Sequence, residues 1–206
     1  MMGRSRHFLA AIAPLIAGAV VLLGAASSAF AHAEKGAVVS FSSGFTHPLN
    51  GLDHMLAMIT VGLLSARMDA KRMWTLPCAF VGMMAVGGIL GLVWASEGVT
   101  AFEWGISLSV LVLGLFVALA PKVNVILGNI VVAVFAICHG HAHVAEMGDA
   151  TVWSYFIGML LATAGLHITG LVAGVLLKKH IGDWILRLAG GAVAAGFVPV
   201  LFGVFG

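Results

Sequence analysis

The sequence predicts an all-α membrane protein, a bundle of six transmembrane helices that follows a cleaved signal peptide. Of the 206 residues, 61% are hydrophobic and 9% are charged, and the mean hydropathy is +1.11. Such a chain has too few polar groups to cover the surface of a water-soluble domain. Apolar segments of about 20 residues, the length that crosses a bilayer, recur along the chain with short polar loops between them. We therefore expect the lipid bilayer as a partner, and no nucleic acid.

The first 31 residues have the three parts of a secretory signal peptide. Arg4 and Arg6 make a basic start, residues 8–24 are apolar, and Ala29, Phe30 and Ala31 end the segment as an A-x-A-like cleavage site. We predict cleavage before His32, which leaves residues 32–206 as a single transmembrane helical domain. Without cleavage, the same segment would be a seventh span.

The charges of the loops predict the orientation of the bundle. The six expected spans cover residues 45–64, 74–94, 104–120, 123–147, 153–177 and 184–205, with a tryptophan near many of their ends, as is usual at membrane interfaces. Loops on one side carry seven basic residues: Arg67, Lys71, Arg72, Lys122, Lys178, Lys179 and Arg187. The other side carries Lys35 and four acids: Glu97, Glu103, Glu146 and Asp149. Because basic loops stay in the cytoplasm, we expect a bacterial inner-membrane protein with both mature termini in the periplasm.

Small residues and cysteines carry less functional information. Gly87 with Gly91, and Gly170 with Gly174, have the four-residue spacing that lets helices approach closely in lipid. We assign these glycines to packing. Cys78 and Cys138 fall at different depths of the predicted bundle, so no disulfide is expected. The chain could also form a homo-oligomer in the bilayer.

A polar motif interrupts the first span, where residues 47–58 read HPLNGLDHMLAM. On a straight helix His47 and His54 share a face, with His54 about 10 Å below His47, and Pro48 allows a helix start or a kink. An ionised Asp53 inside the span costs about 2.5 to 3.5 kcal/mol on insertion scales, so it needs a partner. The partner is either a metal ion bound at a site that includes Asp53, or a histidine or helix end that pairs with Asp53 for structural reasons.

A second motif ends the fourth span, where residues 138–146 read CHGHAHVAE. In a helix, His139, His143 and Glu146 share one face and His141 points away. Two histidines four residues apart can hold one metal ion, a carboxylate can complete the set, and the negative end of the helix dipole favours a cation. His167 is a further candidate, as a deeper station along the path. Two weaker candidates are His141 and His32, and the imidazole and new α-amine of His32 could chelate together.

The two motifs together resemble those of the HupE/UreJ family of nickel and cobalt permeases. The resemblance covers nearly the whole mature chain and is carried by His47, Asp53, His54, His139, Gly140, Ala142, His143 and Glu146. The sequence departs from the family pattern at Cys138, where phenylalanine is usual, and at Val144, where glycine is usual. The resemblance implies uptake of nickel, or of cobalt, for hydrogenase, urease or cobalamin synthesis.

The expected function is inner-membrane uptake of a divalent transition metal through a path lined by histidine and acidic side chains. The ion, nickel first and cobalt second, would bind transiently as cargo, with no prosthetic group and no enzymatic activity. Nitrogen and carboxylate ligands also suit zinc and copper(II), so the choice of nickel comes from the resemblance. Two alternatives stay open: an intramembrane zinc-dependent hydrolase, although the H-E-x-x-H signature is absent, and a haem-binding membrane protein.

Overall fold

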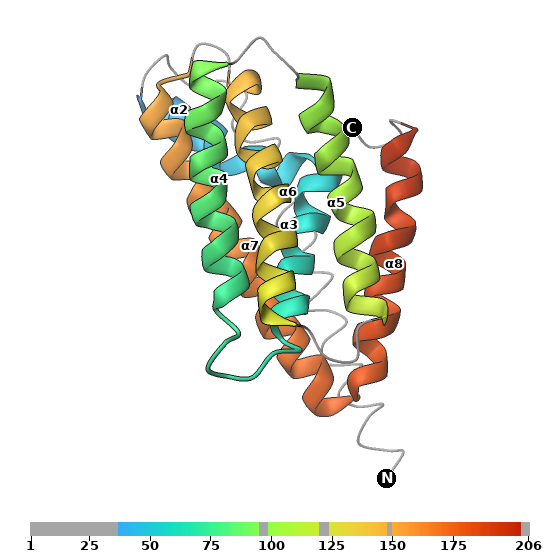
Figure 1. Cartoon of the computed structure of the whole chain (residues 1–206). Helices are drawn as coiled ribbons and strands as arrows, with labels where there is room; N and C mark the ends of the chain where they lie inside the picture. Colours follow the sequence, from blue (N-terminus) through green and yellow to red (C-terminus); the bar gives the residue numbers. More distant parts are fainter. Residues whose placement is uncertain (1–36, 95–98, 120–123, 148–149, 203–206) are drawn as a thin grey trace.

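The computed structural model describes residues 37–94, 99–119, 124–147 and 150–202, which form a helical bundle (Figure 1). The helices are α2 (Ala37–Asn50), α3 (Leu52–Ser65), α4 (Thr75–Val93), α5 (Val99–Leu119), α6 (Val125–Glu146), α7 (Val152–His180) and α8 (Asp183–Leu201). The five from α4 to α8 are long and apolar enough to cross a membrane, and α3 is a shorter apolar helix. The prediction of an all-α membrane protein is confirmed. The predicted signal peptide and His32 lie outside the described residues.

The first predicted span is not one helix, which corrects the expectation for residues 45–64. The chain leaves helical geometry at Gly51, whose φ of −93° and ψ of 122° are extended, and α3 starts afresh at Leu52. Pro48, in the last turn of α2, lacks a backbone N–H, and glycine is a poor helix former, so a break here costs little. With 14 residues, α3 is about 21 Å long, shorter than a bilayer core of about 30 Å.

Glycines allow the helices to pack with their backbones close together. Helix α4 lies beside α6, α5 beside α8, and both α2 and α3 lie along α7 (Figure 1). A Cβ on Gly87 would overlap the carbonyl of Ile137 on α6, and a Cβ on Gly170 would overlap the carbonyl of Ile59 on α3. The packing role predicted for these glycines is confirmed. Such close approach is how helices associate in lipid, where no hydrophobic effect drives them together.

The two ends of the bundle differ in charge. Trp74 and Trp184 lie at one end and Trp94, Trp104 and Trp153 at the other, all 48% to 72% exposed, as expected for two interfacial belts. Every lysine and arginine of the part of the chain described here lies toward the Trp74 end, in the loop after α3, at the end of α7 or in the first turns of α8. Helix α7, with 29 residues, is the longest element and ends in Lys178, Lys179 and His180.

An ion pair between a buried arginine and an exposed aspartate ties this basic end together. The guanidinium of Arg67 donates to Asp183 at 2.9 Å, where α8 starts, and also to the carbonyl of Val117 near the end of α5. Burial lowers the pKa of Arg67 from its usual value, and the neighbouring carboxylate of Asp183 opposes that shift. The pair therefore holds the loop after α3 against α5 and α8.

Candidate metal site

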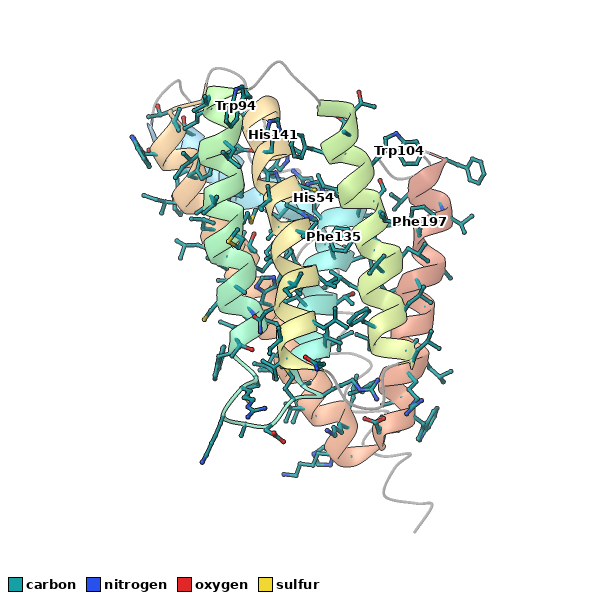
Figure 2. All side chains as sticks on the ribbon, in the orientation of Figure 1. His54, Trp94, Trp104, Phe135, His141 and Phe197 are labelled. Carbon is teal, nitrogen blue, oxygen red and sulfur yellow. The ribbon has the colours of Figure 1, made fainter. Side chains whose placement is uncertain are left out.

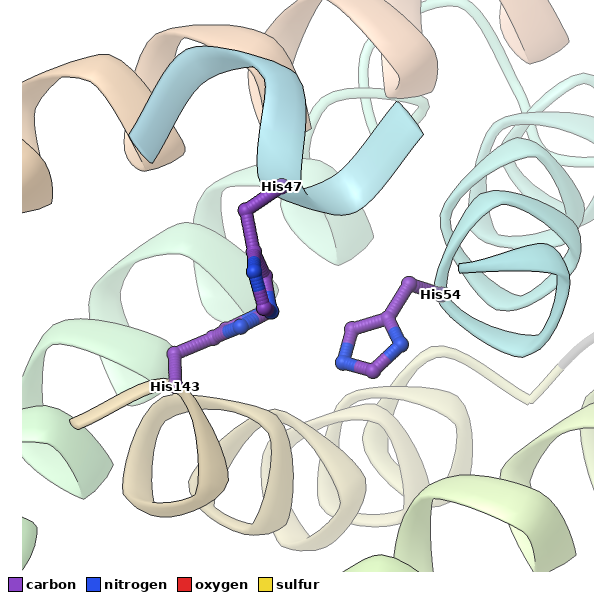
Figure 3. A group of neighbouring side chains, drawn as sticks. All are labelled: His47, His54 and His143. Atoms are coloured by element: carbon purple, nitrogen blue, oxygen red, sulfur yellow. The ribbon is translucent and has the colours of Figure 1, made fainter. Parts of the chain in front are cut away.

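Figure 2 shows His54 inside the bundle, toward the end that carries Trp94 and Trp104. It meets two further histidines, so that three histidines from three helices come together. They are His47 on α2, His54 on α3 and His143 on α6, and one nitrogen of each lies within 4.8 Å of the others. Figure 3 shows their rings pointing toward one another. The ring of His143 lies 4.6 Å from that of His47 and 4.6 Å from that of His54, between centroids. We call these three residues the histidine group.

The break at Gly51 brings the ring of His47 close to that of His54. On a straight helix the two residues would lie about 10 Å apart along the axis. In the structure, their ring centroids are 5.7 Å apart, because the chain turns between α2 and α3. The two rings therefore lie closer together than a straight helix would place the two residues, and the physical cause is the extended backbone of Gly51.

Asp53 fixes the orientation of His54. Its carboxylate oxygen Oδ1 accepts a hydrogen bond from Nδ1 of His54 at 2.7 Å and another from the backbone N–H of His54 at 2.7 Å. A carboxylate can only accept, so the proton of the imidazole sits on Nδ1. The other nitrogen, Nε2, is buried and has no hydrogen-bond partner among the described residues. In metal sites, a carboxylate often accepts a hydrogen bond from one imidazole nitrogen and so leaves the other nitrogen oriented to bind the ion. His54 has this arrangement.

His139 is prepared in a similar way, one helical turn from His143. Its Nδ1 donates to the carbonyl of Phe135 at 2.8 Å, and its Nε2 is buried with no partner within the described part of the chain. The ring of His139 lies 5.2 Å from that of His54, between centroids. A fourth imidazole therefore borders the histidine group. The role of the Phe135 carbonyl could not be predicted from sequence, because it depends on the rotamer of His139.

The helix ends around the histidine group favour a cation. His47 lies in the last turn of α2 and His143 in the last turn of α6, so both helices direct the negative ends of their dipoles at the group. Helix α3 directs its positive end there, but Asp53 in its first turn supplies a negative charge. The helix dipoles and the side chains of the histidine group therefore both favour a bound cation.

The remaining predicted residues lie apart from the group or outside the described side chains. His141 faces α5, where its ring stacks on Phe102 at a centroid distance of 3.8 Å, so it points away as predicted. His167, on α7, is 1% exposed and lies against Phe80, with 4.9 Å between ring centroids. Glu146 is the last residue of α6, but its side chain lies outside what the structure describes. Cys78 and Cys138 are both free, as expected.

Chemically, this arrangement suits a transition metal ion. Imidazole nitrogens are good ligands for zinc, copper, iron and nickel, and poor ones for magnesium or calcium. Around a tetrahedral ion with bonds of about 2 Å, ligand nitrogens lie about 3.3 Å apart. Small rotations of the three rings would bring nitrogens now within 4.8 Å to that spacing.

Comparisons with known proteins point the same way as the two motifs. A family model described as HupE / UreJ protein matches residues 9–198. The chain is 40% identical over 166 residues to a curated relative, "Protein HupE" of Rhizobium leguminosarum bv. viciae. This match covers 78% of this chain and 84% of the relative. No solved structure matches. With a family model that spans most of its length and a relative of this similarity, the chain belongs to the HupE/UreJ family.

Proposed function

We propose that this protein carries a divalent transition metal across the bacterial inner membrane into the cell, with nickel as the first candidate and cobalt as the second. The observation that carries the proposal is the convergence of His47, His54 and His143 at a helix break inside a membrane bundle. Polar residues within membrane spans are costly, and they are usually kept for a function. Membership of the HupE/UreJ family supports the same function.

In the proposed mechanism, the ion enters at the end of the bundle that holds the histidine group. Imidazole nitrogens replace water molecules of the hydrated ion, and His54 presents Nε2 because Asp53 holds Nδ1. The carboxylate of Asp53 also offsets part of the positive charge of the ion. His139 is the next ligand on α6, and His167 lies further along the bundle toward the basic end. Neutral imidazole is the ligand form, so acidification weakens binding through competition with protons.

The test is accumulation of labelled nickel in cells that lack other nickel importers, with cobalt and zinc as competitors. His54→Leu and Asp53→Leu should abolish uptake, while His141→Leu, which faces Phe102 and not the histidine group, should do much less harm. Uptake is normalised to the amount of protein in the membrane. Full uptake by His54→Leu would refute the proposal. If uptake falls only as much as the amount of protein in the membrane, Asp53 and His54 have a structural role instead.

The same assay separates the proposal from its two alternatives. Three imidazoles can also hold zinc with an activated water, as in hydrolytic zinc enzymes, but such an enzyme would not accumulate nickel in cells. A haem protein would show the absorbance of its haem after purification. Cells that accumulate no nickel, or purified protein that shows haem absorbance, would overturn the transport function.

A further inference from the structure

A second cluster of possible ligands lies next to the histidine group, between α3, α4, α6 and α7. Its members are fully buried sulfur, nitrogen and hydroxyl side chains: Met58, Met84, His139, Thr163 and His167, each at most 1% exposed. The hydroxyl of Thr163 lies 3.4 Å from Sδ of Met58 and 3.7 Å from Sδ of Met84. Both sulfur atoms therefore flank one oxygen atom, although they come from different helices.

Helix periodicity connects this cluster to the histidine group and extends it inward. Met58 lies one turn after His54 on α3, and His139 lies one turn before His143 on α6. His167 lies one turn after Thr163 on α7. The ring of Phe80, one turn from Met84 on α4, contacts both His139 and His167, with centroid distances of 5.3 and 4.9 Å. The two imidazoles thus meet at the ring of Phe80, one helical turn from Met84. His167 also lies one turn from Thr163, whose hydroxyl contacts both sulfurs.

The cluster contains polar atoms that packing alone does not explain. Nε2 of His139 and both ring nitrogens of His167 are buried without hydrogen-bond partners among the described residues. Burying such groups inside a membrane bundle is costly unless something binds them. A purely structural core would be more stable with apolar side chains at these positions. Each neutral imidazole offers one lone pair, so His139 and His167 together can present two unpaired nitrogen ligands to a cation.

From this arrangement we propose a second metal station, in which the thioethers of Met58 and Met84 and the imidazoles of His139 and His167 bind a largely dehydrated transition metal ion. This station rests on the proposed function, because it would lie on the same transport path, one helical turn inward from the histidine group. Thioether sulfur is a soft ligand and is neutral, so it favours nickel or copper over magnesium, calcium or manganese. Neutral ligands also hold the ion less strongly than thiolates, which suits a site that must release its cargo.

The test uses purified full-length protein in detergent, with nickel as the probe. Equilibrium dialysis with labelled nickel gives the stoichiometry, and X-ray absorption at the nickel edge shows whether sulfur belongs to the coordination shell. Wild-type protein should bind two ions and show sulfur at about 2.3 Å or slightly beyond. The variant His54→Leu/His143→Leu should keep one ion with sulfur, whereas Met58→Leu/Met84→Leu should keep one ion without it.

Controls separate loss of ligands from loss of fold. Met68→Leu/Met83→Leu removes the same number of sulfurs from the loop after α3 and from the groove between α4 and α6, so it should behave as wild type. Methionine to leucine conserves volume, and size-exclusion chromatography checks that each variant stays folded. A nickel spectrum of the wild type without sulfur overturns the station, as does wild-type stoichiometry in Met58→Leu/Met84→Leu. If nickel binds with sulfur but cells show no uptake, the station stands and the transport function fails.

Discussion

Asp53 decides which nitrogen of His54 faces the other histidines. The carboxylate holds Nδ1 at 2.7 Å and leaves Nε2 buried and unpaired among the described residues. The orientation therefore comes from the residue next to His54 in the sequence, at the first turn of α3. A partner of this kind usually matters for metal affinity nearly as much as the ligands do.

Replacing Asp53 by asparagine tests this role directly. Asp53→Asn keeps an oxygen that can accept from Nδ1 but removes the negative charge, so nickel should bind about 10- to 100-fold more weakly. The measurement is a nickel titration of purified protein. Asp69→Asn, in the exposed loop after α3, is the matched control and should leave the affinity unchanged. An unchanged affinity in Asp53→Asn would mean that the charge takes no part in binding.

The break between α2 and α3 is the element that assembles the histidine group, and Gly51 is the residue that it depends on. The backbone angles of Gly51 are open to any residue, so its importance is steric. A Cβ there would lie 2.9 Å from Oδ1 of Asp53 and 2.9 Å from Nδ1 of His54, too close for either atom to stay in place. The absence of a side chain at Gly51 thus protects the hydrogen bond between Asp53 and His54.

Gly51→Ala should therefore lower nickel uptake by on the order of tenfold while the protein stays in the membrane, because the displaced pair no longer presents Nε2 of His54. Uptake per unit of membrane protein is the measurement. Gly82→Ala on α4 is the control, since a Cβ there meets nothing within 4 Å. Equal uptake by the two variants would show that the pair tolerates movement.

The contact between α4 and α6 makes a separate prediction about stability. A Cβ on Gly140 would overlap the carbonyl of Met84, so Gly140→Ala forces the two helices apart. The expected cost is about 1 to 3 kcal/mol, read as a lower midpoint of thermal unfolding in detergent. Gly165→Ala has open space around it and should be neutral or stabilising by about 0.5 to 1 kcal/mol. A midpoint for Gly140→Ala at or above that of Gly165→Ala would contradict close packing here.

The long helices could be predicted from the sequence because hydropathy and length are local properties. Residues 74–94 were expected to span the membrane, and α4 covers Thr75–Val93. Pro48 indicates a helix start or a kink in this segment, but a full break at Gly51 could not be predicted, because proline and glycine are also tolerated inside membrane helices when neighbours satisfy the backbone. Helical periodicity alone placed His139 and His143 on one face and His141 on another. The level of His47 relative to His54 depends on the backbone angles of one residue, which no periodicity contains.

At the scale of the whole molecule, the charge difference between the two ends predicts the orientation. The described lysines and arginines lie toward the end marked by Trp74 and Trp184, which we expect to face the cytoplasm. A periplasm-dependent reporter such as alkaline phosphatase, fused after Gly206, should be active. The same reporter inserted in the loop after α3, next to Lys71, should be inactive. The reverse pattern would place the histidine group at the cytoplasmic end and would contradict entry of the ion from the periplasm.

The lengths of α3 and α7 make the protein an uneven match for its bilayer. With 29 residues, α7 is about 44 Å long, whereas the hydrocarbon core is about 30 Å thick and α3 reaches only about 21 Å. Hydrophobic mismatch of this kind is relieved by tilting, by snorkelling of terminal basic side chains such as Lys178, or by local changes of bilayer thickness. A Cβ on Gly62 would overlap the carbonyl of His167, so α3 and α7 are in backbone contact. We therefore expect acyl-chain length to affect the tilt of these two helices, and with it the positions of His54 and His167 relative to the imidazoles of α6.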